Sequence, residues 1–153
     1  MIYIKDHVLS NVDIDQLRPF VEQPDWNSWD QSLQVNVPQT NDIVQKVKNT
    51  INADFNNSHP LFDEVDWSQI VVYDTGCSKN FHLDHASDKT TGTSVTFLNE
   101  DFVGGEAIVE GVQIVPIKGR TYYMDGKMYK HAVLNVIKGA RYTLTCWYKK
   151  ING

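Results

Sequence analysis

The stretch "KNFHLDHASD" places His82, Asp84 and His85 within four positions of the chain. Imidazole nitrogens and carboxylate oxygens are common metal ligands, so this cluster indicates either a metal site or a polar strand face exposed to water. If the segment is a strand, its side chains alternate between two faces. His82 and Asp84 then share one face, and His85 shares the other with Phe81 and Leu83. We therefore expect His82 and Asp84 to act as a pair and His85 to lie outside the site.

A third ligand must come from elsewhere in a chain that contains five histidines. His7 and His59 lie in the N-terminal region, whereas His131 lies in the later run "MYKHAVLNV", 47 positions after Asp84 (131 − 84). Two histidines and one carboxylate on a β-scaffold form the facial triad of non-haem iron oxygenases, which leaves coordination positions open for a chelating cosubstrate and dioxygen. Zinc more often takes a three-histidine or cysteine-rich set. The combination with His131 therefore favours iron.

Arg141 is the candidate receptor for a carboxylate on such a cosubstrate. It begins the run "RYTLTCW", in which strand alternation would place Arg141, Thr143, Thr145 and Trp147 on one face. An arginine beside hydroxyl groups on an inward face can bind a carboxylate with two parallel hydrogen bonds. Tyr73, in "VVYDTG", is expected to donate a further hydrogen bond. Arg141 in a structural ion pair and Tyr73 as a core residue are the alternative interpretations.

The first 60 or so residues read as helical and connecting segments. "NVDIDQLRPF" is a predicted helix with Asn11 as its cap. "QTNDIVQKVKNTINADF" is a predicted amphipathic helix, capped by Thr40 or Asn41, whose apolar residues recur at three and four positions. Between them, "QPDWNSWDQSLQ" reads as a polar connection in which Trp26 and Trp29 pack against the core. This region would support the remainder of the fold from outside.

From about residue 67 to residue 149, short apolar or alternating runs are separated by turn signals such as "VGGE", "MDGK" and "IKGA". Seven or eight short strands at this spacing predict a sandwich or barrel. Gly104-Gly105 is expected to provide a bend at the start of a strand. The predicted fold class is α+β, with a jelly-roll core covered on one side by N-terminal supporting helices.

Composition limits the classes of function. The 153 residues suffice for a packed core, and we expect residues 1–153 to form one domain. A formal net charge of −5 argues against a surface that follows nucleic-acid phosphates. No stretch has the length of a membrane span, and no signal peptide is visible. Cys77 and Cys146 belong to no paired motif, so we expect a reducing, cytoplasmic setting (the host cytoplasm if the source is a virus).

Together these residues resemble the Fe(II)- and 2-oxoglutarate-dependent dioxygenases, in particular the prolyl 4-hydroxylase branch that includes the oxygen-sensing prolyl hydroxylases. The resemblance covers about residues 67 to 149 and rests on an ordered set of motifs: Tyr73-x-x-Gly76, His82-x-Asp84, "FLNEDFVGGE", His131-x-Val133 and "GARYTLTCW". It implies a double-stranded β-helix fold. It also implies that 2-oxoglutarate and O2 are converted to succinate and CO2 while a C–H bond is hydroxylated.

The resemblance also implies a role for individual residues. The iron ligands would be His82, Asp84 and His131. Arg141 would pair with the distal carboxylate of the cosubstrate 2-oxoglutarate, with Tyr73 and Thr145 hydrogen-bonding near it. The pocket would be lined by Val95, Phe97 and Trp147. Ascorbate often keeps the iron reduced in this family.

The substrate implied by the resemblance is a prolyl residue in a peptide or protein. Phe97 stands where some relatives have a tyrosine that contacts the cosubstrate, and "NEDFVGGE" and "ASDKTTGTS" are short for segments that clamp a peptide. A free amino acid or another small molecule therefore remains an alternative substrate. Trp147 stands where nucleic-acid demethylases carry a second arginine, which argues against repair of alkylated DNA or RNA.

Two alternatives fall outside this chemistry. A non-catalytic jelly-roll binding module could retain the triad by descent, although such a module would be expected to lose a ligand or the arginine. An isomerase of the cupin type would be expected to have more histidines together with a glutamate.

Overall fold

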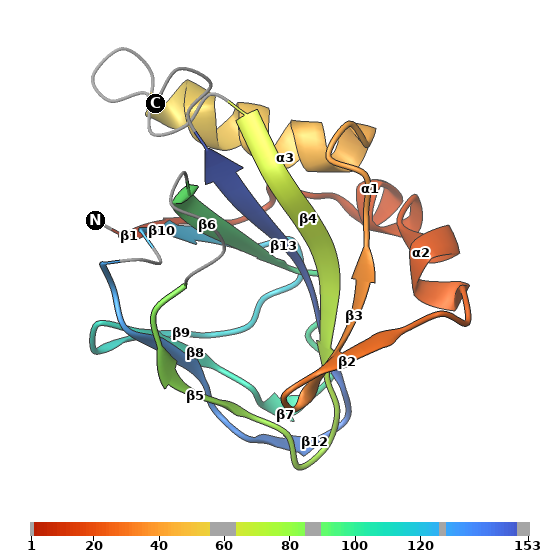
Figure 1. Ribbon diagram of the computed structural model, residues 1–153, viewed down its shortest axis with the longest axis vertical. Coiled ribbons are helices and arrows are strands. Elements are labelled where there is room, and N and C mark those ends of the chain that lie inside the picture. Colours follow the sequence, from red (N-terminus) through yellow and green to blue (C-terminus); the bar gives the residue numbers. More distant parts are fainter. Residues whose placement is uncertain (1, 56–63, 85–89, 126–127, 150–153) are drawn as a thin grey trace.

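The computed structural model describes residues 2–55, 64–84, 90–125 and 128–149, in which two antiparallel sheets face each other (Figure 1). The larger sheet has the order β1-β10-β6-β13-β4-β3-β2. Its strands are β1 (Ile2–Lys5), β2 (Asn27–Trp29), β3 (Ser32–Asn36), β4 (Glu64–Tyr73), β6 (Thr90–Phe97), β10 (Thr121–Met124) and β13 (Arg141–Lys149). The smaller sheet, in the order β5-β11-β8-β9, contains β5 (Lys79–His82), β8 (Ala107–Val109), β9 (Val112–Ile114) and β11 (His131–Val133). A separate pair joins β7 (Val103–Gly104) to β12 (Val136–Lys138).

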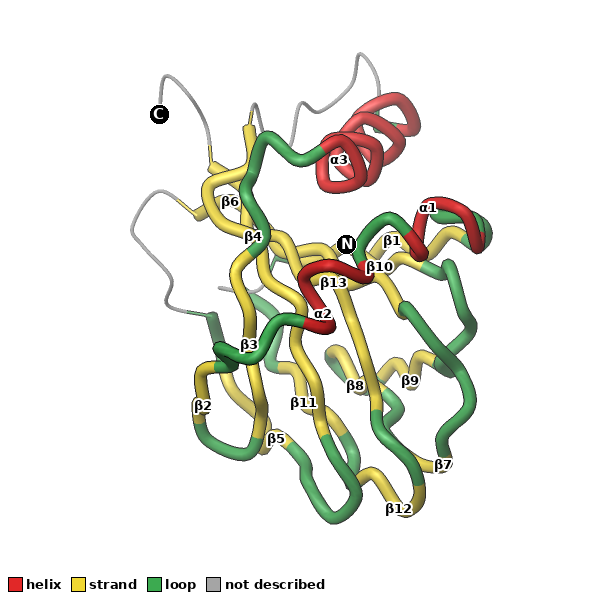
Figure 2. Tube along the Cα trace, turned by 90° about the vertical axis from the view of Figure 1, so that its right-hand side faces the viewer, coloured by secondary structure: helices red, strands yellow, loops and turns green. Residues whose placement is uncertain are grey.

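Three helices cover the outer face of the larger sheet, as the side view shows (Figure 2). They are α1 (Asn11–Asp15), α2 (Arg18–Glu22) and α3 (Asp42–Asp54). Strand alternation explains the layering, because Ile70 and Leu144 pack in the core with the helices, whereas Val71 and Thr143 face the smaller sheet. One face of the larger sheet is therefore sealed by helices, and the other is available for a pocket. The predicted α+β jelly-roll fold is confirmed.

The helix predicted in "QTNDIVQKVKNTINADF" is confirmed as α3. The side chain of Asn41 accepts a hydrogen bond from the backbone N–H of Ile43, 2.9 Å away, and so caps the helix. The single helix predicted in "NVDIDQLRPF" is two short helices, α1 and α2, and its predicted cap was wrong. Ser10 caps α1 instead, because its hydroxyl accepts from the N–H of Asp13 while the Asp13 carboxylate accepts from the N–H of Ser10.

The prediction that the first 60 residues are only helical and connecting was wrong in three places. Strand β1 pairs with β10, and β2 and β3 form a hairpin that pairs with β4. These strands are only three to five residues long, and β1 and β2 lie at the edges of the sheet. Such short segments show too little alternation of apolar and polar residues to be recognised without their partner strands. Trp26 packs against the core as expected, but Trp29 is 66% exposed and is not a packing residue.

The run "EAIVEGV", predicted as one strand, forms the hairpin of β8 and β9. Its turn residues Glu110 and Gly111 both have positive φ angles, 46° and 81°. Two consecutive left-handed residues form the tight turn whose twist matches that of antiparallel strands. The strand count predicted from the sequence was therefore too low in this region.

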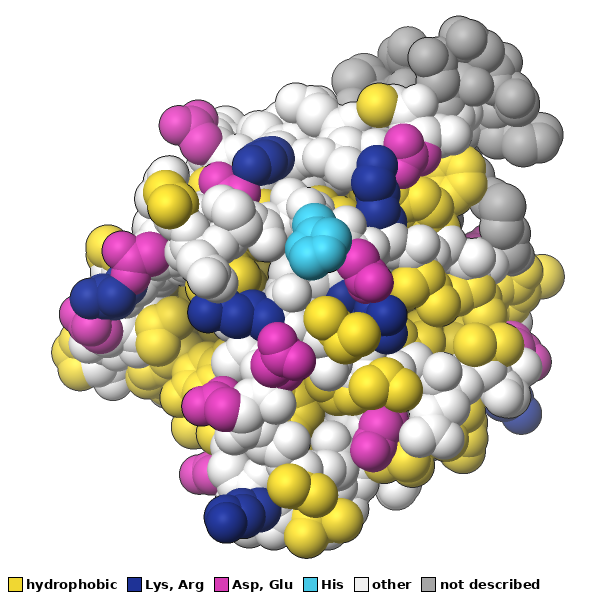
Figure 3. Space-filling model, turned by 180° about the vertical axis from the view of Figure 1, so that it is seen from behind, with side chains coloured by type: hydrophobic (Ala, Val, Ile, Leu, Met, Phe, Trp, Pro, Cys, Tyr) yellow, Lys and Arg dark blue, Asp and Glu magenta, His cyan; other side chains and the backbone are white. Residues whose placement is uncertain are grey.

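The molecular surface carries both signs of charge. On the face turned away from the viewer in Figure 1, acidic and basic side chains are interspersed among apolar ones (Figure 3). Within the described ranges, no helix combines the length and the hydropathy that a membrane span requires.

Candidate active site

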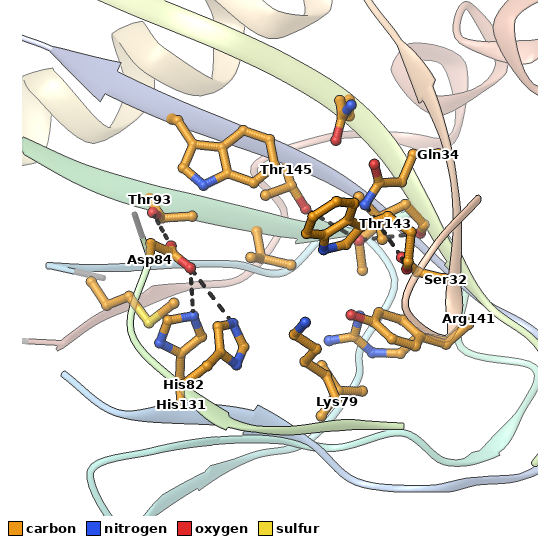
Figure 4. Close-up of a pocket in the computed structure, with 18 of the residues that line it drawn as sticks. Ser32, Gln34, Lys79, His82, Asp84, Thr93, His131, Arg141, Thr143 and Thr145 are labelled. Atoms are coloured by element: carbon orange, nitrogen blue, oxygen red, sulfur yellow. Dashed lines mark hydrogen bonds and ion pairs between the residues drawn. The ribbon is translucent and has the colours of Figure 1, made fainter. Parts of the chain in front are cut away.

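The two sheets enclose a pocket of about 560 Å³ (Figure 4). Strands β2, β3, β4, β6, β10 and β13 of the larger sheet and β5 and β11 of the smaller sheet contribute side chains to it. All six residues assigned to the site from the sequence line this pocket: Tyr73, His82, Asp84, His131, Arg141 and Thr145. Its volume is in the range of small-molecule sites.

His82, Asp84 and His131 converge at one end of the pocket. His82 ends β5 and His131 begins β11, where the two are cross-strand partners with ring centroids 4.1 Å apart. The Nε2 atom of His131 lies 3.1 Å from Oδ1 of Asp84, and Nε2 of His82 lies 3.6 Å from the same oxygen. Adjacent ligands about 2.1 Å from one ion lie about 3 Å apart, so small adjustments would let this set hold a single metal.

The route by which these residues meet differs from the sequence prediction. Strand β5 ends at His82, and Asp84 follows it outside the strand, so the two do not share a strand face by alternation. The pairing of β5 with β11 brings the two histidines together, and Asp84 then turns toward both. His85 lies outside the described residues, so its expected position outside the site stays a prediction.

Backbone carbonyls orient both imidazole rings. Nδ1 of His82 lies 2.7 Å from the carbonyl oxygen of Asn80, and Nδ1 of His131 lies 2.9 Å from that of Tyr129. A carbonyl oxygen can only accept, so both Nδ1 atoms carry the proton, and in neutral rings both Nε2 lone pairs face Asp84. Lone pairs that face a carboxylate without an intervening proton are stabilised by a cation. The donor set therefore fits a bound metal, and the carbonyls are the outer contacts that orient metal-binding histidines.

The Asp84 carboxylate is charged at neutral pH. Burial would raise its pKa, but the adjacent imidazoles of His131 and His82 and the hydrogen bond from Thr93 outweigh burial and hold the pKa well below its usual range. The Thr93 hydroxyl donates to Oδ2 over 2.7 Å, which leaves Oδ1 facing the histidines. The carboxylate is thus oriented as a one-oxygen ligand.

Arg141 lies at the other end of the pocket (Figure 4). Its side chain is among the most deeply buried in the described chain, with the residue 2% exposed. Its Nε donates to the carbonyl oxygen of Gly105 over 2.8 Å, whereas its buried Nη2 makes no hydrogen bond with the described residues. A buried guanidinium donor without an acceptor is costly, and a carboxylate is the acceptor that matches it best. This end of the pocket therefore fits an anionic group of a small ligand.

Comparison with protein families decides the class of this site. Residues 68–149 match the model of the 2OG-Fe(II) oxygenase superfamily. The chain belongs to this superfamily. The family implies Fe(II) and 2-oxoglutarate, and the His-Asp-His set and the unpaired nitrogen of Arg141 fit that metal and cosubstrate. A comparison with curated proteins gave no match.

Solved structures show that the oxygenase shares its fold with prolyl hydroxylases. It is similar to a Pseudomonas putida prolyl-4-hydroxylase (18% identity, TM-score 0.75, covering 97% of this chain and 92% of that one). It is also similar to the viral collagen prolyl hydroxylase of Paramecium Bursaria Chlorella virus-1, solved with 2-oxoglutarate (19%, 0.73, 98% and 96%). A third similar structure is a Trichoplax adhaerens prolyl hydroxylase in complex with a hypoxia inducible factor peptide fragment (16%, 0.77, 97% and 83%). At these identities the likeness establishes the fold.

Gly105 allows the oxygenase to place Arg141 as it does. Gly104 and Gly105 have φ angles of +80° and +69°, so the pair has a special backbone conformation, but at the end of β7 and not at the start of a strand as predicted, since β8 begins at Ala107. A Cβ atom on Gly105 would lie 3.1 Å from Cδ of Arg141 and 3.0 Å from the ring of Phe102. A larger residue would therefore combine backbone strain with displacement of the arginine.

Tyr73 and Thr145 lie where the sequence predicted. Tyr73 is the cross-strand partner of Arg141, and the Arg141 Cζ atom lies 5.5 Å from the centroid of its ring. Burial raises the pKa of Tyr73 to about 12, against the opposing charge of Arg141, so its hydroxyl remains a neutral donor. Thr145 lines the pocket, with its hydroxyl 3.4 Å from that of Thr143.

One predicted lining residue is replaced by another. Val95 and Trp147 line the pocket as expected, but Phe97 is fully buried beneath Arg141, with its ring centroid 5.1 Å from Cζ. Tyr122, the partner of Val95 on β10, lines the pocket instead. Burial raises the pKa of Tyr122, while the charge of Arg141 acts in the opposite direction. Phe97, on β6, stands where some relatives have a tyrosine. In this protein Tyr122 of β10 places a tyrosine hydroxyl near Arg141.

Other lining residues were not predicted from the sequence. Thr93 could have been found, because it precedes Val95 by two positions on the same strand. Lys79 and Tyr122 gave no local signal. Their positions depend on which strands pair, and pairing between distant segments is not encoded in the spacing of single residues.

Proposed function

We propose that this oxygenase hydroxylates a prolyl residue in a peptide or protein, while 2-oxoglutarate and O2 are converted to succinate and CO2. The observation that carries the proposal is the unpaired, buried Nη2 of Arg141 in the same pocket as His82, Asp84 and His131. One end of the pocket suits a metal, and the other suits the distal carboxylate of a metal-chelating cosubstrate. The prolyl substrate is supported by the fold shared with three prolyl hydroxylases, one of them in complex with a peptide.

Each side chain has a defined task in this proposal. His82, Asp84 and His131 hold Fe(II), which when bound supplies the redox chemistry and the template for the cosubstrate and O2. Arg141 binds the distal carboxylate and sets the depth to which the cosubstrate enters. Tyr73 and Thr145 donate hydrogen bonds beside it.

Apolar neighbours strengthen these polar contacts. Val71 and Val95, the cross-strand partners of Thr143 and Thr145, line the pocket and are themselves buried, which limits water around the bound carboxylate. Charge-assisted hydrogen bonds are stronger in such a low-dielectric setting. Thr93 and the two backbone carbonyls keep the ligands in place during turnover.

The proposal includes the setting in which the enzyme works. Its partners are a proline-containing peptide or protein and O2, and ascorbate would keep the iron reduced between turnovers. Both cysteines are free thiols, which supports a reducing, cytoplasmic location.

The first test is an anaerobic titration of the protein with Fe(II) and 2-oxoglutarate, monitored by the visible charge-transfer band of the chelate. We expect the band in the wild type and not in His82→Ala. His7→Asn is the matched control, because it removes a histidine that does not line the pocket. A folded wild type without the band would refute the iron site and favour a non-catalytic binding module.

The second test admits O2 and follows succinate together with the mass of the substrate. Proline-containing peptides should gain one oxygen atom for each succinate formed. Turnover with free proline or another amino acid, and with no peptide, would replace the proposed substrate by a small molecule while leaving the cofactor chemistry intact.

A further inference from the structure

A second buried polar atom of the pocket lacks a partner. Gln69, on β4, is 4% exposed and lines the pocket, and its Oε1 atom makes no hydrogen bond with the described residues. The other such atom in the lining, within the described chain, is the donor Nη2 of Arg141. A buried acceptor without a donor destabilises the free protein, so a ligand that brings an N–H or O–H group to Gln69 would bind favourably.

Neighbouring hydrogen bonds fix which end of the Gln69 amide is unpaired. The indole N–H of Trp67 donates to Oδ1 of Asn36 over 3.2 Å. An indole nitrogen can only donate, so Asn36 must present its oxygen to Trp67. The same oxygen accepts from Nε2 of Gln69 over 2.9 Å, and Asn36 does not line the pocket. The NH2 end of Gln69 is therefore held by Asn36, and Oε1 is the end left for a ligand.

Gln69 lies nearer the metal end of the pocket than the Arg141 end. Along β4 it is two positions from Trp67 (69 − 67) and four from Tyr73, the partner of Arg141 (73 − 69). Trp67 and Thr93 flank the same residue of β13, and the Thr93 hydroxyl donates to the metal-binding carboxylate (Figure 4). The free oxygen of Gln69 is thus better placed for a group that approaches the metal than for the distal carboxylate of the cosubstrate.

Among the reactants of the proposed function, only the substrate can supply the missing donor. The keto and carboxylate oxygens of 2-oxoglutarate only accept hydrogen bonds when the acid is ionised, and O2 has no hydrogen. The target prolyl residue has no N–H, because its nitrogen is closed into the ring. The N–H of the residue after the target is closer to the prolyl Cα along the chain than the N–H of the residue before it. It is therefore the nearest donor that a polypeptide substrate offers.

We propose that Oε1 of Gln69 accepts a hydrogen bond from the backbone N–H of the residue that follows the target prolyl, with Asn36 as a positioning residue for the Gln69 amide. The inference rests on the proposed function and adds a specificity to it. The residue after the target must carry an N–H, so a second proline is excluded there. Sites built to bind a substrate N–H reject analogues without it, because the protein acceptor then stays buried and unpaired.

The first test compares three peptides that differ only after the target prolyl, where they carry alanine, N-methylalanine or lactic acid. Lactic acid replaces the N–H by an ester oxygen and adds no bulk. We expect kcat/KM for the ester peptide to be about 30-fold below that for the alanine peptide. The N-methyl peptide should be at least as poor. In a peptide that contains Pro-Pro-Ala, only the second proline should gain an oxygen atom, as located by mass spectrometry.

Gln69→Met tests whether this residue is the acceptor, since methionine keeps the length of the side chain and has no oxygen. It should lower kcat/KM for the alanine peptide and leave the ester peptide nearly unchanged, so the ratio of the two falls from about 30 to about 1. The KM for 2-oxoglutarate should be nearly unchanged.

Gln34→Met is the matched control. Gln34 also lines the pocket, but its amide donates to Ser32, and its oxygen is not among the buried unpaired atoms of the described residues. This variant should keep the ratio of the alanine peptide to the ester peptide at about 30.

Asn36→Asp and Asn36→Leu test the positioning role at an exposed residue. Aspartate presents only oxygens, so it should still accept from Trp67 and Gln69 and keep the wild-type ratio. Leucine allows the Gln69 amide to turn round, so the ratio should fall about threefold. Because Asn36 lies outside the pocket, this pair still tests the proposal if Gln69→Met fails to fold.

The outcomes separate this inference from the proposed function. Hydroxylation of the alanine and ester peptides with equal kcat/KM would overturn the hydrogen bond and leave the prolyl function standing, even if the bulkier N-methyl peptide is rejected. An unchanged ratio in Gln69→Met would give the substrate N–H to another acceptor and overturn the role of Gln69. Turnover of free proline alone would overturn the proposed peptide substrate, and the inference with it.

Discussion

The two ends of the pocket are built in different ways. The metal end uses short strands of the smaller sheet and one residue outside a strand, and its side chains keep some exposure: 30% for His82, 12% for Asp84 and 11% for His131. The opposite end is Arg141 on β13, a nine-residue strand paired on both sides. Polar groups at the metal end contact one another, whereas the guanidinium keeps a donor unpaired among the described residues.

This difference shows which part of the molecule orients each group. The three metal ligands are held by contacts with one another and by a few hydrogen bonds, so the packing of the rest of the protein depends little on them. An unpaired buried donor raises the energy of the folded state and persists only because the surrounding sheet holds it there. Changes at the metal end should therefore affect iron binding and turnover with little effect on stability. Changes at Arg141 should lower the affinity for the ligand while leaving the free protein at least as stable.

The largest effect is expected for His131→Ala. Loss of one of the three metal ligands should reduce succinate formation by more than about 100-fold. Removing a residue that only orients a metal ligand usually costs about 10- to 100-fold, so a larger loss is expected here. The free energy of unfolding should change by less than about 1 kcal/mol, measured by urea denaturation. His7→Asn serves as the control, and near-normal turnover in His131→Ala would refute the triad.

Arg141→Met should raise the KM for 2-oxoglutarate about 100-fold, because it keeps the apolar stem and removes the carboxylate receptor. Without ligand, the variant should be at least as stable as the wild type, since no buried guanidinium donor remains unpaired at this position. Saturating 2-oxoglutarate should raise the melting temperature of the wild type and not that of the variant. Arg120→Met, at a surface arginine paired with Asp6, is the control. An unchanged KM would remove Arg141 from its role.

Thr93→Val should weaken Fe(II) binding about tenfold in a competition titration, because Asp84 loses the hydrogen bond that orients its Oδ2 atom. With saturating iron, the KM for 2-oxoglutarate should not change. Thr96→Val is matched to it, because Thr96 is also buried on β6 but bonds to Thr121 outside the pocket. Equal iron affinities in the two variants would show that Asp84 needs no such support.

Tyr73→Phe should have the smallest effect, about fivefold on the affinity for 2-oxoglutarate, as expected for one hydrogen bond of about 1 kcal/mol. Because burial raises the pKa of Tyr73 to about 12, its hydroxyl stays protonated across the usual assay range. The ratio of wild-type to variant affinity should therefore be the same at neutral pH and at a pH near the ordinary tyrosine pKa of about 10. A ratio that falls toward the higher pH would mean that Tyr73 titrates near the ordinary value.

Much of the site could be predicted from the sequence because its signals are local. Helix α3 follows from an asparagine cap and apolar residues at three and four positions. Alternation along "RYTLTCW" correctly placed Arg141, Thr143 and Thr145 on one inward face. Such patterns depend on neighbours a few residues apart, which the sequence shows directly.

Other features could not be predicted, because they depend on strands that meet across the chain. Tyr122 reaches the pocket only because β10 pairs with β6, and Trp29 reaches it only because the β2–β3 hairpin pairs with β4. Asp84 was assigned correctly for an incorrect reason, since it follows the strand instead of sharing its face with His82.

The sequence by itself determined which residues carry the chemistry, their order along the chain and the period of the elements that hold them. The tertiary structure alone decided how far apart the groups lie, which hydroxyl stands beside Arg141 and which rings border the pocket. The physical reason is that local conformation responds to near neighbours, whereas strand partners are chosen by the burial of whole faces, which requires the folded chain.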